Sequence, residues 1–160
     1  MKLPIVAYGD PVLKKVCTEI DETYPDLQQL IKNMFETMNN ASGVGLAAPQ
    51  IGLPIRLFIV DTKGDEEEKA YIKVFINAQI LEEAGEPWAF NEGCLSIPEV
   101  REDVMRKPNI LISYYDENWV KDLEDDDNWL EDLMGPGISS YSDMKPFARY
   151  AFNKSHAAAY

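Results

Sequence analysis

The chain has 160 residues, of which 46% are apolar, and its 28 acidic and 15 basic side chains give a formal net charge of −13. This length and apolar content predict one domain with a core. Phosphate backbones repel such a polyanion, and no apolar run approaches the roughly 18 residues of a membrane-spanning helix, so we expect neither a nucleic-acid nor a membrane partner.

The cysteine content and the N-terminal residues indicate the compartment. Two cysteines, Cys17 and Cys94, are too few for a disulfide framework and fit a reducing environment, although a bridge between them stays formally open. Pro4 and then Asp10-Pro11 break the apolar N-terminus too early for a signal peptide. We therefore expect a cytoplasmic protein.

Two helices are predicted in the first 40 residues. Asp10 as N-cap and Pro11 as first helical residue start a helix within residues 10–22. A second helix is predicted over residues 26–40, because apolar residues recur there at the spacing of one helical face. The members of this stripe are Leu27, Leu30, Ile31, Met34 and Met38, and Gly43 follows as a stop signal.

The strands predicted next are rich in branched and aromatic residues. They cover residues 55–61, 71–80 and 109–115, with a charged loop at 62–69. Residues 81–92, which include a glycine and a proline, are interpreted as a loop or a weak strand. The order of elements predicts an α+β fold in which an antiparallel sheet packs on helices.

The last part of the chain has a different character. An acidic run at residues 122–127 is interpreted as a solvated surface, and the breaker Gly135-Pro136-Gly137 follows it. Neither helix nor strand periodicity is present after residue 134. We expect a single domain over residues 1–160, with an irregular segment at 121–160.

The first motif is at residues 43–50, with the sequence GVGLAAPQ. Its glycines allow close backbone approach, and the extended Gly45-Leu46-Ala47 segment can pair with a peptide by strand addition. The carboxamide of Gln50 can donate to a carbonyl oxygen or to its oxyanion. The alternative interpretation is a helix C-cap followed by a tight crossing into a strand.

The second motif is at residues 92–96, with the sequence EGCLS. The thiolate of Cys94 is a suitable ligand for zinc or ferrous iron, and the Leu95 N–H is placed to stabilise an oxyanion. Two alternatives stay open: a buried structural cysteine, or a nucleophilic cysteine whose base would have to be the single histidine, His156.

The two motifs, about 45 residues apart in this order, resemble those of the peptide deformylases. Residues 6–13 and 97–101 add to this resemblance, which covers roughly residues 3–120. It implies an α+β deformylase fold and metal-dependent hydrolysis, with iron or zinc, of the formyl group of formyl-methionyl nascent peptides. The expected partners are these nascent peptides and the ribosome.

The resemblance also implies residue roles. Cys94 would be a metal ligand, and Gln50 and the Leu95 N–H would be catalytic by stabilising the oxyanion. The residues implied in substrate binding are Gly43, Gly45, Leu46, Glu92 and Arg101.

One motif of the family is missing from this sequence. The two histidine ligands of the family come from an H-E-x-x-H helix, whereas this chain has one histidine and carries Pro136 and Ser140 at the corresponding spacing. The alternatives are a catalytically inactive, deformylase-like peptide-binding module without the metal site, a tail that differs from the family's own, a rearranged site with His156, or an unrelated interaction protein.

Overall fold

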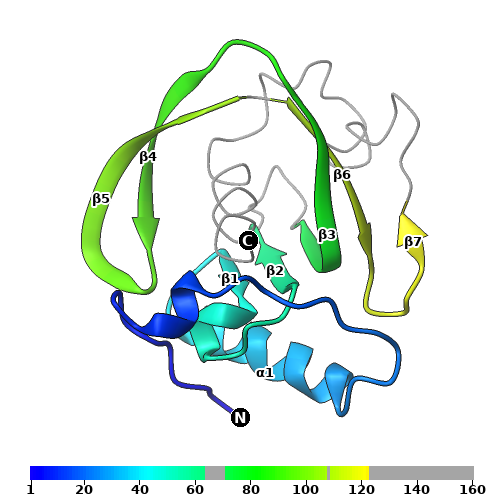
Figure 1. The fold of residues 1–160 in the computed structure, drawn as a ribbon. Helices are drawn as coiled ribbons and strands as arrows, with labels where there is room; N and C mark the ends of the chain where they lie inside the picture. Colours follow the sequence, from blue (N-terminus) through cyan, green and yellow to red (C-terminus); the bar gives the residue numbers. More distant parts are fainter. Residues whose placement is uncertain (64–70, 108, 123–160) are drawn as a thin grey trace.

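The fold is described from a computed structural model for residues 1–63, 71–107 and 109–122 (Figure 1). The expectations for the later residues, including Pro136, Ser140 and His156, fall outside this part. The elements in chain order are η1 (Pro11–Lys14), α1 (Leu27–Asn40), β1 (Gly45–Ala47), η2 (Ala48–Ile51), β2 (Leu57–Asp61), β3 (Ile72–Ala84), β4 (Trp88–Cys94), β5 (Ile97–Arg106), β6 (Asn109–Tyr115) and β7 (Lys121–Asp122).

The strands form two antiparallel sheets. One has five strands in the order β1-β2-β3-β6-β7, and the other is a two-stranded ribbon of β4 and β5. The ribbon curves away from the larger sheet, and its tip returns toward the N-terminal segment (Figure 1). This return brings the second sequence motif back to the body of the fold.

Helix α1 covers one face of the five-stranded sheet, as its apolar stripe predicts. Ile31, Met34 and Met38 are buried in one cluster with Leu57 and Ile59 of β2. The helix begins after Asp26, which has a φ of +53° and makes no side-chain cap. The predicted helix at 26–40 is confirmed, and packing of its apolar face is the main source of its stability.

The other face of the sheet carries a second apolar cluster. Phe58 and Val60 point to this face because side chains alternate along β2. Phe58 stacks on Phe75 with ring centroids 4.6 Å apart, and Phe75 contacts Tyr114 at 4.5 Å. Because both faces of β2 are buried, its sequence is a continuous apolar run.

The expected helix at residues 10–22 is reduced to one turn. Asp10 caps that turn by accepting the Val12 N–H at 2.9 Å, so the predicted start is confirmed but the predicted length is wrong. Past Lys15 the backbone is extended because it bonds to other segments: the Thr18 N–H donates to the Pro54 carbonyl at 3.0 Å, and the Asn77 carboxamide bonds both backbone groups of Ile20.

Of the two interpretations of residues 81–92, the strand is confirmed for most of the segment and the loop is limited to residues 85–87. Strand β3 continues to Ala84, and β4 starts at Trp88 after a turn in which Gly85 has a φ of +90°. Strand β5, which was not predicted, pairs with β4 along its length. The predicted strands at 55–61, 71–80 and 109–115 correspond to β2, β3 and β6.

Within the described residues, no helix is both long and apolar enough to cross a bilayer.

Candidate functional site

The second motif forms the tip of the β4–β5 ribbon. Cys94 is the last residue of β4 and pairs with Ile97, so Leu95 and Ser96 are the two residues of the turn. A register shift between Gly93 and Cys94 changes the direction of the strand at this point. The tip is partly buried: Ser96 is buried, and Leu95 packs against the cluster beneath α1.

The first motif meets this tip through Gln50 in η2. The Gln50 side chain is 3% exposed, and its Oε1 accepts the Ala47 N–H at 3.1 Å. Its Nε2 donates to Cys94 Sγ at 3.9 Å and to Ser96 Oγ at 3.4 Å. The structure therefore brings two of the predicted site residues, Gln50 and Cys94, into contact although they are 44 positions apart.

Gly43 lies at a close contact between the two motifs. A Cβ at this position would be 2.7 Å from Leu95 Cδ1 and 3.2 Å from Met38 Cγ. The left-handed residue at the end of α1 is Ser42, with a φ of +54°, and the Gly43 N–H donates to the Met38 carbonyl at 2.9 Å. Gly43 thus allows the ribbon tip to approach the helix end, and its role in substrate binding stays a prediction.

Gly45 lies on an edge strand. Strand β1 pairs with β2, and among the described strands none pairs with the second edge of β1. The Ala47 N–H turns away from β2 to Gln50, and backbone groups of alternate residues face the same side, so those of Gly45 also face the open edge. The side chain of Leu46 is fully buried in the core.

The remaining two predicted residues lie on the ribbon. Glu92 is in β4, and its side chain is outside the described part of the structure. Arg101 is exposed on β5 opposite Gly93, and it donates to Asn91 Oδ1 at 2.6 Å and to the Asn91 carbonyl at 2.8 Å. The structure therefore places Arg101 opposite the residue that precedes Cys94, with its guanidinium held by Asn91.

The two cysteines have different environments. Cys94 is half-buried, whereas Cys17 is buried on the segment that follows η1. Burial raises the pKa of the Cys17 thiol, and the nearby Arg56 guanidinium opposes part of this rise. Both thiols are unpaired, so no Cys17–Cys94 disulfide is present.

This difference predicts unequal thiol reactivity. At pH 8, after treatment with a chelator, iodoacetamide is expected to modify Cys94 at least about tenfold faster than Cys17, because the thiolate is the nucleophile and burial disfavours it at Cys17. Peptide mass mapping over time gives both rates. In urea the two rates should converge, and equal rates in the folded protein would contradict the structure.

The described residues fit a metal centre in part. Cys94 is one candidate ligand, but no group of three or more His, Cys, Asp or Glu side chains comes together within the described ranges. The single histidine of the sequence, His156, lies outside them. The described part of the chain therefore provides one thiolate beside a carboxamide, which is fewer ligands than a catalytic metal site takes from its protein.

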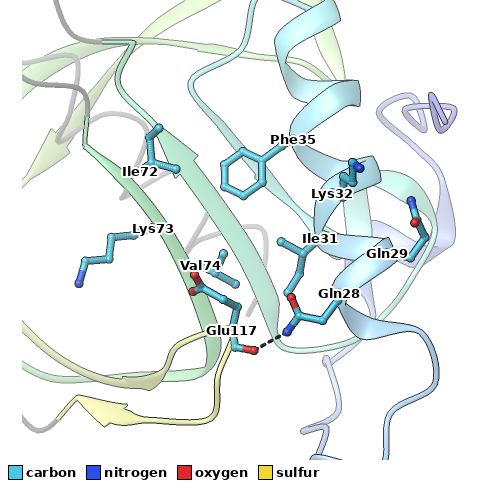
Figure 2. Close-up of a pocket in the computed structure, with 9 residues that line it drawn as sticks. All are labelled: Gln28, Gln29, Ile31, Lys32, Phe35, Ile72, Lys73, Val74 and Glu117. Atoms are coloured by element: carbon cyan, nitrogen blue, oxygen red, sulfur yellow. Dashed lines mark hydrogen bonds between the residues drawn. The ribbon is translucent and has the colours of Figure 1, made fainter.

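A cavity of about 550 Å³ lies elsewhere, between α1 and β3. Figure 2 shows Ile31 and Phe35 of α1 facing Ile72 and Val74 of β3, with Gln28 bonded to the Glu117 carbonyl at 2.5 Å. None of the predicted site residues lines this cavity. It is therefore separate from the site at Gln50 and Cys94.

The fold and the site define an α+β protein in which a half-buried thiol and an oriented carboxamide lie beside a strand edge that no described strand pairs with. A sequence model of the family described as polypeptide deformylase matches residues 2–131. The chain is 61% identical over 135 residues to a peptide deformylase of Christiangramia forsetii, covering 78% of this chain and 69% of that protein. It is 60% identical over 136 residues to that of Flavobacterium psychrophilum, with 78% and 70% covered.

Solved structures agree with this result. The peptide deformylase of Thermotoga maritima matches with a TM-score of 0.75 at 29% identity, covering 99% of this chain and 92% of that one. The peptide deformylase of Acinetobacter baumannii with Met-Ala-Ser bound matches with a TM-score of 0.70 at 29% identity, over 76% and 81%. The chain belongs to the peptide deformylase family, whose members are metal-dependent hydrolases of protein biosynthesis.

The comparisons confirm the resemblance and the α+β fold expected from the two motifs. They do not support the interpretation of an inactive chain, since relatives at about 60% identity are peptide deformylases. Sequence reasoning missed one residue of the site: Ser96, which follows Cys94 and Leu95 in the motif but has no spacing signal that would assign it a role.

Proposed function

We propose that this chain hydrolyses the N-terminal formyl group of formyl-methionyl peptides, with Gln50 Nε2 as a donor to the formyl oxygen. The observation that carries the proposal is the contact of Gln50 Nε2 with Cys94 Sγ at 3.9 Å. A donor fixed in a buried site stabilises negative charge developing on a carbonyl oxygen without reorganisation. The Leu95 N–H is the second donor in this proposal.

Cys94 is proposed as one ligand of a divalent metal, iron or zinc. A thiolate at a half-buried position suits either ion. When bound, such an ion supplies a water of lowered pKa as the nucleophile and polarises the carbonyl. The chain's own residues orient the substrate: Gln50 and Leu95 act at the formyl oxygen, and the second edge of β1 at Gly45 accepts the peptide backbone.

The substrate is proposed to be a peptide that begins with methionine. The A. baumannii relative was solved with Met-Ala-Ser bound, a peptide of this kind. The second edge of β1, with which no described strand pairs, supports an extended peptide, because strand addition satisfies backbone groups whatever the side chains. Nascent chains in the cytoplasm, at the ribosome, are the proposed source of such peptides.

The test is formate release from formyl-Met-Ala-Ser by the purified protein supplied with ferrous iron or zinc. We expect turnover by the wild type. Cys94→Ala should lower the rate of formate release by on the order of 10³-fold or more, because the variant should lose the bound metal and with it the lowered pKa of water. Cys17→Ala is the matched control, since Cys17 is buried outside this site, and it should keep activity and metal content.

Two outcomes would contradict the proposal. Binding of the formyl peptide without formate release would instead support a peptide-binding module. Equal metal content in the wild type and Cys94→Ala would remove Cys94 from the ligand set. Calorimetric titration of the peptide and metal analysis of each variant separate these outcomes.

A further inference from the structure

The orientation of the Gln50 carboxamide is set by its two ends. Oε1 accepts the N–H of Ala47 at 3.1 Å, and because a backbone N–H can only donate, the oxygen must lie at that end. The NH₂ group therefore points to the ribbon tip, where Ser96 Oγ is 3.4 Å and Cys94 Sγ is 3.9 Å from Nε2. The bond from Ala47 anchors the acceptor oxygen of the carboxamide, and the contacts with Ser96 and Cys94 involve its NH₂ donor.

Ser96 is itself held firmly in place. Its side chain is buried, and its carbonyl accepts the Tyr8 N–H at 2.8 Å. The same N-terminal segment donates the Val6 N–H to the carbonyl of Gln50 at 2.9 Å. One N-terminal segment thus bonds the backbones of both residues, which fixes the separation of the two motifs independently of the side-chain contact.

An amide plane held at one end is less firmly fixed than one held at both ends. The terminal torsion of a glutamine has a broad energy profile, and the bond from Ala47 restrains it through the oxygen alone. A second contact at Nε2 fixes it. The amide has two N–H groups, and when the hydroxyl of Ser96 accepts one of them, the other is left on the side of Cys94, whose Sγ is 3.9 Å from Nε2.

We propose that Ser96 is a positioning residue, whose buried hydroxyl accepts one N–H of the Gln50 carboxamide and thereby aims the other at the formyl oxygen of the substrate. This inference rests on the proposed function of Gln50. Ser96 does not contact substrate in this arrangement. It acts through Gln50, and its loss should reduce turnover more than substrate affinity.

The first test uses the metal-free protein and needs no turnover. The side-chain NH₂ resonances of Gln50 are assigned by their loss in Gln50→Glu. In the wild type they should exchange with water at least about tenfold more slowly than those of exposed Gln79, because Gln50 is bonded and buried. In Ser96→Ala the Gln50 pair should shift and broaden, and Ser96→Thr, which keeps the hydroxyl, should restore it.

The second test is kinetic. Ser96→Ala should lower kcat by about two- to twelvefold, the range that one net hydrogen bond contributes. KM should stay within about twofold, and Ser96→Thr should recover most of the loss in kcat. Ser113→Ala on β6 is the matched control and should change neither value. If the wild type releases no formate, the proposed function fails, whereas the resonances still test the role of Ser96.

Unchanged Gln50 resonances in folded Ser96→Ala would overturn the proposal. Exchange of the Gln50 NH₂ protons in the wild type as fast as that of the Gln79 NH₂ protons would also overturn it. This second measurement does not depend on the folding of any variant.

Discussion

Gln50→Glu is expected to lower kcat/KM for deformylation by about 100- to 1,000-fold, the cost of removing one donor from an oxyanion site. The substitution is nearly isosteric, and a carboxylate oxygen can still accept the Ala47 N–H. What it removes is the NH₂ donor that faces Cys94 and Ser96. It also places negative charge where negative charge develops on the substrate oxygen.

The measurement is steady-state formate release with formyl-Met-Ala-Ser, with metal content determined for each preparation. The matched control is Gln79→Glu, the same change at an exposed position of β3, which should leave both kcat and KM unchanged. A loss confined to KM, or a loss explained entirely by missing metal, would contradict the assignment of Gln50 as a donor in the transition state.

The elements that the sequence predicts well are those with strong periodicity. Helix α1 has an apolar stripe because one of its faces is buried, and strand β2 has a continuous apolar run because both of its faces are buried. The ribbon of β4 and β5 has no such pattern, because most of β5 is exposed. Its pairing comes from cross-strand contacts such as the bond from Asn91 Nδ2 to Asp103 Oδ1, which residue spacing does not reveal.

The sequence predicts part of the candidate site, as it predicts part of the fold. Two motifs in order indicated Gln50 and Cys94, and the structure brings these side chains together. Single residues predicted local structure less reliably than the two motifs predicted the site. Gly43 indicates a helix stop, yet Ser42 takes the left-handed conformation at the helix end, and Gly43 instead allows the close approach of Leu95. Ser96 could not be found from sequence, because its role depends on a contact across the fold.

Phe75→Ala is expected to destabilise the protein by about 3–5 kcal/mol, since removing a buried phenylalanine loses its transfer free energy and leaves a cavity. Phe75 is 1% exposed and lies between Phe58 and Tyr114 in the second cluster. Each aromatic contact adds about 0.5–1.5 kcal/mol beyond burial. Because a typical domain has only about 5–15 kcal/mol of stability, this single change should approach the limit of folding.

Urea unfolding followed by circular dichroism measures the effect. Phe75→Leu keeps most of the volume and should cost about 1–2 kcal/mol, so the difference between the two variants reports the cavity. Tyr8→Ala is the aromatic control, because its side chain is 75% exposed, and its effect should stay within about 0.5 kcal/mol. A Phe75→Ala protein as stable as the wild type would mean that this face of the sheet is not a packed core, and the site at the neighbouring edge would then lack the rigid support that its donor geometry requires.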